Sequence, residues 1–205
     1  MHSQNRNILV IKKFLFLFIL FLGLINTIEN PKIPKEISAP MDLALQSKNY
    51  VTIPYIQKNF VGFKEALAFK ESQGKYRVVN TLGYLGKYQF GTSTLKRFKI
   101  YNTTSFLHNP ELQEQVFIAY CKVNKWILRK DINSSVGKIM NGVKITESGI
   151  LAAAHLSGAG NVKKYLRSNG LKNLSDAYGT SINSYMKKFS GYDVSFIKAD
   201  RKASI

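Results

Sequence analysis

A stripe of apolar side chains that ends in a carboxylate restricts the fold of this chain more than any other feature. Its members follow one another at steps of three, four and four residues: Phe60, Phe63, Leu67 and Glu71. This spacing predicts one face of one helix, which Gly74 is expected to end. The helix C-terminus and the apolar surroundings are both expected to raise the pKa of the Glu71 carboxyl. Such an acid can give a proton to a leaving group, the general-acid half of glycosidic bond cleavage.

The first residues have the order of a secretory signal. Arg6, Lys12 and Lys13 precede an apolar block over residues 14–25, which is a charged segment followed by a short hydrophobic one. The block is too short to span a bilayer comfortably. Residues 1–28 are therefore expected to be a signal peptide, with an uncleaved N-terminal membrane anchor as the alternative. The protein is expected to be exported to the periplasm, the cell envelope or the medium.

The charge and the cysteine content restrict the possible binding partners of the chain and the interactions that can stabilise its fold. The chain carries 30 Lys and Arg against 12 Asp and Glu, and residues 1–28 hold three of the cations and none of the acids, so removing them leaves 27 minus 12, or +15. Such a surface attracts anionic polymers. For an exported chain these are envelope polyanions and not nucleic acid, and a simple aid to solubility is the alternative. Cys121 is the only cysteine, so no intramolecular disulfide can form. It is expected to pack as a small apolar residue.

The remaining chain predicts a tether followed by one mainly α domain. Residues 29–59 hold four of the five prolines and are expected to be extended, with one short helix over 41–47. Residues 60–192 are expected to form the domain and residues 193–205 a basic tail. A small β-hairpin or ordered loop is expected over 74–86, directly after the helix that carries the acid. Further helices are expected over 92–98, 110–129 (capped by Asn109), 146–156, 162–167 (capped by Asn161) and 173–189.

Four short motifs appear along the chain in a fixed order. Glu71-Ser72 is followed by Gly86-Lys87-Tyr88-Gln89, whose Gln lies eighteen residues beyond the acid. Residues 153–160 read Ala-Ala-His-Leu-Ser-Gly-Ala-Gly, and Tyr185 follows Thr180. In order and spacing these motifs resemble the lytic transglycosylase and goose-type lysozyme superfamily, in particular the soluble lytic transglycosylase-like catalytic domain.

This resemblance implies a lysozyme-like α+β fold over roughly residues 60–189, with a cleft that binds peptidoglycan glycan strands. It implies Glu71 as the catalytic acid and base, with no cofactor and no metal. It also implies substrate contacts from residues around the acid: Ser72, Gly86, Tyr88, Gln89, Phe90, His155 and Tyr185. Some positions depart from the family pattern. His155 and Leu156 occupy positions where the family usually has Tyr and Asn, and Lys87, Tyr88 and Phe90 replace smaller apolar residues. The preference for particular sugar subsites is therefore expected to differ.

Several of these residues have a structural alternative. Ser72 could cap local backbone, and Gln89 could be a satisfied structural amide. His155 is expected to be a packed or cleft-lining side chain and not a metal ligand or base. One of three aromatic residues is expected to touch substrate, the others being core or rim residues: Tyr84, Tyr88 and Phe90.

The run from Ser72 to Pro110 contains no Asp or Glu, so the segment after the helix offers no second carboxylate of the kind that most glycosidases use. A one-carboxylate mechanism fits better. As the resemblance implies, Glu71 protonates the oxygen between MurNAc and GlcNAc, and the substrate's N-acetyl group stabilises the cation. The same Glu then deprotonates the C6 hydroxyl, which gives a 1,6-anhydroMurNAc end.

Two other functions stay open from the sequence. A second acid folding back to the cleft would favour a hydrolytic lysozyme, and the candidates are Glu111, Glu114 and Glu147. A catalytically weak peptidoglycan-binding module would keep the fold and the basic surface without turnover. The oligomeric state and the choice between endo and exo action are not determined.

Overall fold

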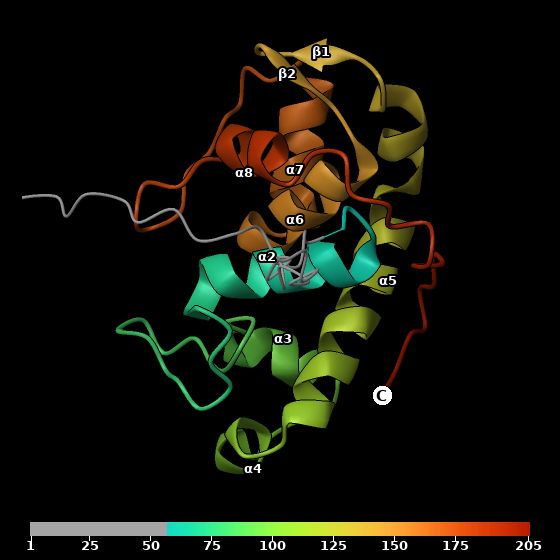
Figure 1. Ribbon diagram of the computed structural model, residues 1–205. Helices are drawn as coiled ribbons and strands as arrows, with labels where there is room; N and C mark the ends of the chain where they lie inside the picture. Colours follow the sequence, from blue (N-terminus) through green and yellow to red (C-terminus); the bar gives the residue numbers. More distant parts are fainter. Residues whose placement is uncertain (1–56) are drawn as a thin grey trace, which may run out of the picture. The chain divides into compact units, whose positions relative to one another are not determined.

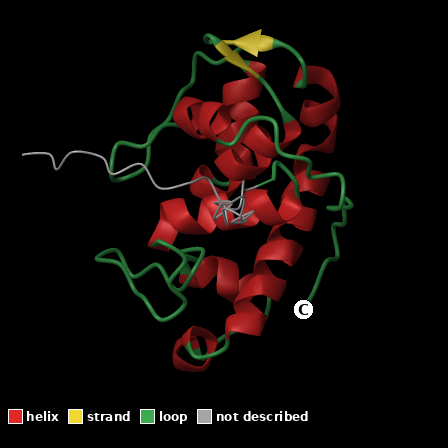
Figure 2. Cartoon of the chain, viewed as in Figure 1, coloured by secondary structure: helices red, strands yellow, loops and turns green. Residues whose placement is uncertain are grey.

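The computed structural model describes residues 57–205, so the expected signal segment and nearly all of the expected tether lie outside the described residues. The described chain is mainly α with a small antiparallel hairpin, which confirms the expected fold class (Figures 1 and 2). None of its helices combines the length and the apolar character needed to cross a membrane. In chain order the elements are α2 (Phe60–Ser72), α3 (Thr92–Arg97), α4 (Thr103–Leu107), α5 (Pro110–Ser135), β1 (Ile139–Met140), β2 (Val143–Lys144), α6 (Glu147–Ser157), α7 (Ala159–Arg167) and α8 (Ile182–Lys188).

Polar caps begin the helices at most of the expected places. The Asn109 side chain accepts a hydrogen bond from Leu112 N at 3.0 Å, and Pro110 takes the first helical position of α5, where its missing N–H has no consequence. Thr146 caps α6 in the same way. Helix α5 runs to Ser135, beyond the expected end near residue 129, because its last turns still bury Leu128 and Ile132.

Two of the helix predictions are wrong. Helix α7 begins at Ala159, so Asn161 is not its cap, and the Asn161 amide instead donates to Ser157 O at 3.0 Å. Residues 173–181 form a loop, and only Ile182–Lys188 is helical. The loop forms because its short polar side chains hydrogen-bond local backbone in place of a helix. Asp176 Oδ1, for example, accepts from Tyr178 N and Thr180 N.

The regular hairpin lies after α5 and not after α2. Strands β1 and β2 pair antiparallel through an Asn141-Gly142 turn in which both residues have positive φ, 47° and 72°. This is the turn chemistry that favours tight hairpins, and the Asn-Gly pair was the signal available for it in the sequence. For the segment after α2 a hairpin or an ordered loop was expected, and the structure has the loop. It contains isolated β-bridges between Val79 and Leu85 and between Leu85 and Phe90.

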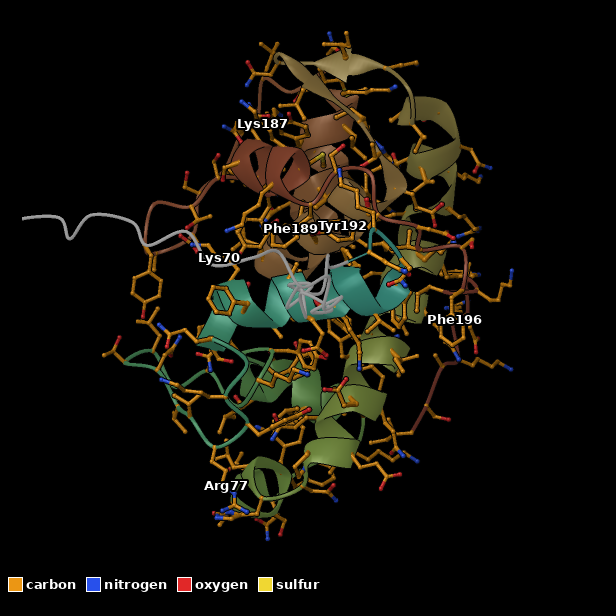
Figure 3. The ribbon with its side chains drawn as sticks, viewed as in Figure 1. Lys70, Arg77, Lys187, Phe189, Tyr192 and Phe196 are labelled. Carbon is orange, nitrogen blue, oxygen red and sulfur yellow. The ribbon has the colours of Figure 1, made fainter. Side chains whose placement is uncertain are left out.

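The expected stripe on α2 faces the core, with its two ends, Phe60 and Glu71, half-buried. Phe63 and Leu67 are fully buried, and the Phe63 ring contacts Phe117 of α5 and two rings near α8, Phe189 and Tyr192. Figure 3 shows Phe189 and Tyr192 between α8 and α2. Helix α6 contacts α5, α7 and α8, and its residues from Ser148 to Ala154 are all buried.

The segment expected as a basic tail packs against the domain. Val194 and Ile197 are buried, and the centroid of the Phe196 ring lies 5.1 Å from that of Phe60. Asp193 N also donates to Lys58 O at 2.7 Å. Cys121 is buried as expected, and burial raises the pKa of its thiol.

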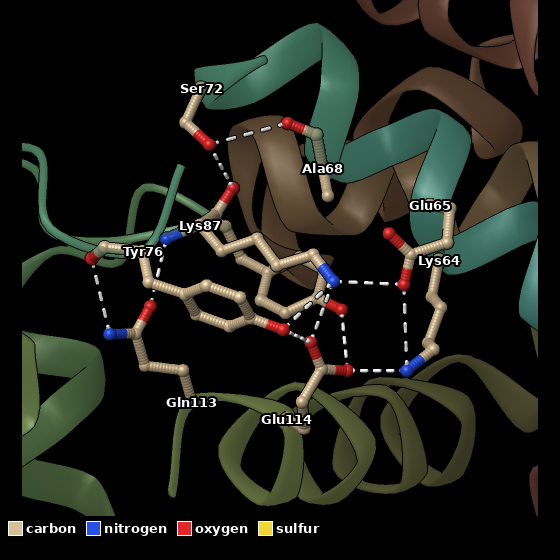
Figure 4. Close-up of polar contacts among 9 residues, drawn as sticks. Lys64, Glu65, Ala68, Ser72, Tyr76, Lys87, Gln113 and Glu114 are labelled. Atoms are coloured by element: carbon tan, nitrogen blue, oxygen red, sulfur yellow. Dashed lines mark hydrogen bonds and ion pairs between the residues drawn. The ribbon is translucent and has the colours of Figure 1, made fainter. Parts of the chain in front are cut away.

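A polar network joins α2, the loop after it and α5 (Figure 4). At its centre the Glu114 carboxylate accepts hydrogen bonds from Lys64 Nζ at 2.5 Å, Lys87 Nζ at 2.7 Å, and the hydroxyls of Tyr76 and Tyr88, both at 2.8 Å. Burial opposes ionisation of this acid, but the four hydrogen bonds more than offset it and lower the pKa of Glu114 to about 2. Glu114 is therefore ionised at neutral pH and balances a lysine, Lys87, that is only 4% exposed.

Replacing Glu114 by Gln is expected to lower the free energy of unfolding at neutral pH by on the order of 3 kcal/mol, because Lys64 and Lys87 lose their counter-charge. A depressed folded-state pKa contributes stability that is present above the ordinary value of 4.5 and is lost as pH falls toward about 2. The wild-type protein should lose stability over that interval, and the variant should lose less. Urea unfolding at a neutral and several acid pH values measures both effects.

Glu111→Gln is the matched control for this experiment. Glu111 lies three residues earlier on α5, is exposed and forms no ion pair with the described residues. Its change in unfolding free energy should stay within about 0.5 kcal/mol. Equal unfolding free energies for Glu114→Gln and the wild type would contradict the stabilising role of the network.

Candidate active site

The C-terminal end of α2 carries Glu71 into a cleft. Glu71 lines a cavity of about 100 Å³, and a neighbouring cavity of about 420 Å³ extends toward α3. The two share five lining residues and form one continuous cleft: Leu82, Tyr84, Gln89, His155 and Leu156. The walls come from the loop between α2 and α3, the end of α6, and the loop between α7 and α8. The two loops meet where Thr81 Oγ1 and Tyr178 Oη share a hydrogen bond at 2.9 Å.

Tyr185 holds the Glu71 carboxylate from α8. Its hydroxyl donates to Glu71 Oε1 at 2.6 Å, and its ring is buried. Burial, the charge of Glu71 and the hydrogen bond to it raise the pKa of Tyr185, so the hydroxyl keeps its proton and remains a donor. Glu71 makes no ion pair with any described residue. The structure thus brings two of the predicted site residues into direct contact across 114 positions of sequence.

Gln89 lies in both parts of the cleft. Its backbone has a positive φ of 51°, and its side-chain amide donates to Gly86 O at 2.8 Å. The turn that holds it requires glycine at position 86, because a Cβ there would lie 2.2 Å from the Gln113 side-chain oxygen. Gly86 therefore has a structural reason for its presence. One N–H of the Gln89 amide is thus used within the turn, and its side-chain oxygen accepts no hydrogen bond from the described residues.

His155 is a neutral cleft-lining residue. Burial lowers the pKa of its imidazole and outweighs the opposite effect of the nearby Glu71 charge. Its Nε2 lies 2.7 Å from Tyr88 O, and because a carbonyl only accepts, Nε2 carries the hydrogen. Nδ1 is then an acceptor, and it is buried without a partner among the described residues. The ring packs edge-on against Phe90, with centroids 5.5 Å apart.

The other predicted contacts divide between cleft and core. Phe90 lines the larger cavity, and Tyr84 lines both parts with 44% of its surface exposed. Tyr88 lies in the core instead, fully buried and stacked 4.1 Å from Phe117. Ser72 Oγ donates to Lys87 O at 2.7 Å, which matches its structural alternative of binding backbone.

None of the three acids considered as a second carboxylate lines the cleft. Glu114 belongs to the network with Lys87, Glu147 pairs with Lys125, and Glu111 is exposed at the start of α5. The acid that does line the cavity with Glu71 is Asp176, which the sequence reasoning missed. The available signal was the turn sequence Asp176-Ala-Tyr-Gly-Thr, which the expected helix over 173–189 concealed.

Within residues 57–205 no group of three or more His, Cys, Asp or Glu side chains is arranged to hold a metal ion. The polar groups in or beside the cleft include the carboxylates of Glu71 and Asp176, the imidazole of His155, the amide of Gln89 and the hydroxyl of Tyr185. No family model, no curated protein and no solved structure matches this chain.

Proposed function

We propose that this protein is an enzyme that cleaves the β-1,4 bond between MurNAc and GlcNAc in peptidoglycan, with Glu71 as general acid. The observation that carries the proposal is the placement of Glu71 at a helix end, in a cleft, with a hydrogen bond from Tyr185 and no ion pair to the described residues. An acid held this way is available for proton transfer. The substrate class rests on the resemblance of the four motifs to lytic transglycosylases.

The proposed reaction begins when Glu71 protonates the bridging oxygen and the bond to the MurNAc C1 breaks. In the transglycosylase route the ionised Glu71 then takes the proton of the C6 hydroxyl, whose oxygen closes onto C1 and gives a 1,6-anhydro end. That hydroxyl is favoured as a nucleophile because it is held in the same molecule as C1, at a high effective concentration. The tyrosine hydroxyl of Tyr185 holds the carboxylate in place during both transfers.

A hydrolytic lysozyme is a second candidate, favoured by Asp176. The one-carboxylate route was expected because residues 72–110 contain no acid, but Asp176 comes from the loop before α8. Asp176 lines the same cavity as Glu71. A module that binds the wall without turnover is the remaining alternative. Such a module would bind sacculi but release no fragments from them.

The proposed site of action is the periplasm, the cell envelope or the medium, where peptidoglycan is found. The excess of Lys and Arg over Asp and Glu supports attraction to the anionic polymers of that compartment. The segment from which export was expected lies outside the described residues.

Glu71→Gln is expected to keep the fold and to lower the rate of wall cleavage by on the order of 10² to 10⁴, because an amide cannot donate and recover the proton. Release of soluble fragments from purified sacculi measures the rate, and circular dichroism checks the fold. Glu111→Gln, which removes the same charge outside the cleft, should cleave as the wild type does. A folded Glu71→Gln variant that retains more than about a tenth of wild-type turnover would contradict the assignment.

Binding to sacculi is expected to weaken as salt rises, because exposed charges are screened over about 8 to 10 Å at moderate ionic strength. The cleavage rate at saturating substrate should change little, since the acid acts inside the cleft. Co-sedimentation with sacculi at a low and a high salt concentration measures the first effect, and fragment release measures the second. Binding that does not respond to salt would identify the cleft, and not the basic surface, as the main anchor.

A further inference from the structure

Two acids differ from the other buried or half-buried acids of the described chain, because they lack an ion-pair partner. Most buried or half-buried carboxylates of residues 57–205 form ion pairs, as Glu114, Asp131 and Glu147 do. Glu71 and Asp176 are half-buried and have no ion-pair partner among the described residues. Both line one cavity, although cations outnumber acids by 30 to 12 in the chain.

The loop between α7 and α8 holds Asp176 in place. Its Oδ1 accepts hydrogen bonds from Tyr178 N at 2.9 Å and Thr180 N at 2.7 Å, and its own backbone N–H donates to Thr180 O at 2.9 Å. Gly179, with a φ of 80°, allows the chain to turn. One carboxylate oxygen is therefore bound to the loop. The other, Oδ2, receives no hydrogen bond from the described residues.

The charges of Asp176 and Glu71 both affect the hydroxyl of Tyr185. The pKa of Tyr185 is raised by burial, by Glu71 and, to a smaller extent, by the charge of Asp176, so both carboxylates lie within electrostatic reach of one hydroxyl. The cavity that they line has a volume of about 100 Å³. This exceeds the volume of about 30 Å³ that one water occupies in the liquid. The cavity therefore has room for a water beside Glu71 and Asp176.

We propose that Asp176 is the second carboxylate of the cleft and activates a water for hydrolysis, which rests on the proposed cleavage by Glu71. Glu71 gives its proton to the bridging oxygen, and the C1–O bond breaks. A water oxygen forms the new bond to C1, and one proton of that water passes to Asp176 Oδ2. Asp176 then releases this proton to solvent, and Glu71 takes one back. The net reaction consumes one water and leaves a reducing MurNAc end.

The test is the ratio of two products in one digest. Sacculi are digested by the full chain in ¹⁸O-water, and mass spectrometry counts new MurNAc ends that carry ¹⁸O against 1,6-anhydro ends. Most wild-type ends should carry ¹⁸O. Asp176→Asn should lower the ratio at least about tenfold, because base assistance to the water is lost, while the C6 hydroxyl still captures the cation. A ratio within one digest does not depend on the fraction of protein that is folded.

Two variants separate chemistry from loop structure. Asn keeps a side-chain oxygen for Tyr178 N and Thr180 N, and Asp176→Ser, which can also bind local backbone, serves if Asp176→Asn does not fold. Asp193→Asn is the matched control, because Asp193 Oδ1 accepts from Ser195 N at 2.8 Å in a similar exposed turn outside the cleft. Its ratio should equal that of the wild type.

The outcomes also separate this inference from the function on which it rests. Wild-type products with anhydro ends alone, or an unchanged ratio in Asp176→Asn, would overturn the role of Asp176 and leave cleavage by Glu71 intact. A wild-type protein that releases no fragments, or a Glu71→Gln variant that cleaves at the wild-type rate, would overturn both.

Discussion

The cleft depends on the carboxylate of Glu114. This group lies on α5 and binds Lys87 and Tyr88, two consecutive residues of the loop after α2. The backbone of the same two residues reaches the site, since Lys87 O accepts from Ser72 beside Glu71 and Tyr88 O binds His155 Nε2. One carboxylate thus holds the strip of chain against which both the acid-bearing helix and the histidine are placed. Gln89 follows directly in this strip.

The network also explains why a lysine occupies position 87, where the family that the motifs resemble has a smaller apolar residue. A lysine that is almost fully buried would cost several kcal/mol if it were unpaired. Here Lys87 Nζ binds Glu114 at 2.7 Å and Glu65 at 2.8 Å, and these contacts raise its pKa against the opposing effect of burial. The charged side chain therefore points away from the cleft and serves the core. The Tyr88 hydroxyl also binds Glu114. Lys87 and Tyr88 together fix the loop by polar contacts, where small apolar residues would give only packing.

The charge distribution separates two tasks. Glu65, Glu114, Asp131 and Glu147 form ion pairs with nearby lysines and an arginine and serve the structure of the domain. The acids that line the cleft keep their oxygens for Tyr185, for local backbone N–H groups and for a ligand. Among the described residues no Lys or Arg lines either part of the cleft. The cations of the domain therefore lie outside it, where the proposed anionic polymer would bind.

By itself the sequence determined the features that depend on neighbours along the chain. The three-and-four spacing that ends at Glu71 placed that residue on a buried face, and Asn109-Pro110 began α5, because periodicity and caps are local. The motif order also singled out Gln89, His155 and Tyr185, which do line or support the cleft. The Asn141-Gly142 hairpin was equally local and was readable, although it was not predicted.

Tertiary structure alone decided which side chains meet. Tyr88 lies in the core and Tyr84 in the cleft, although both are tyrosines of one loop, because only Tyr88 faces Glu114 and Phe117. Asp176 reaches the cavity of Glu71 because the chain between α7 and α8 turns back over the cleft. Such a contact brings together residues far apart in sequence and leaves no periodic trace in it. Composition and spacing therefore identified the acid, and only the packing of loops against helices identified its partners.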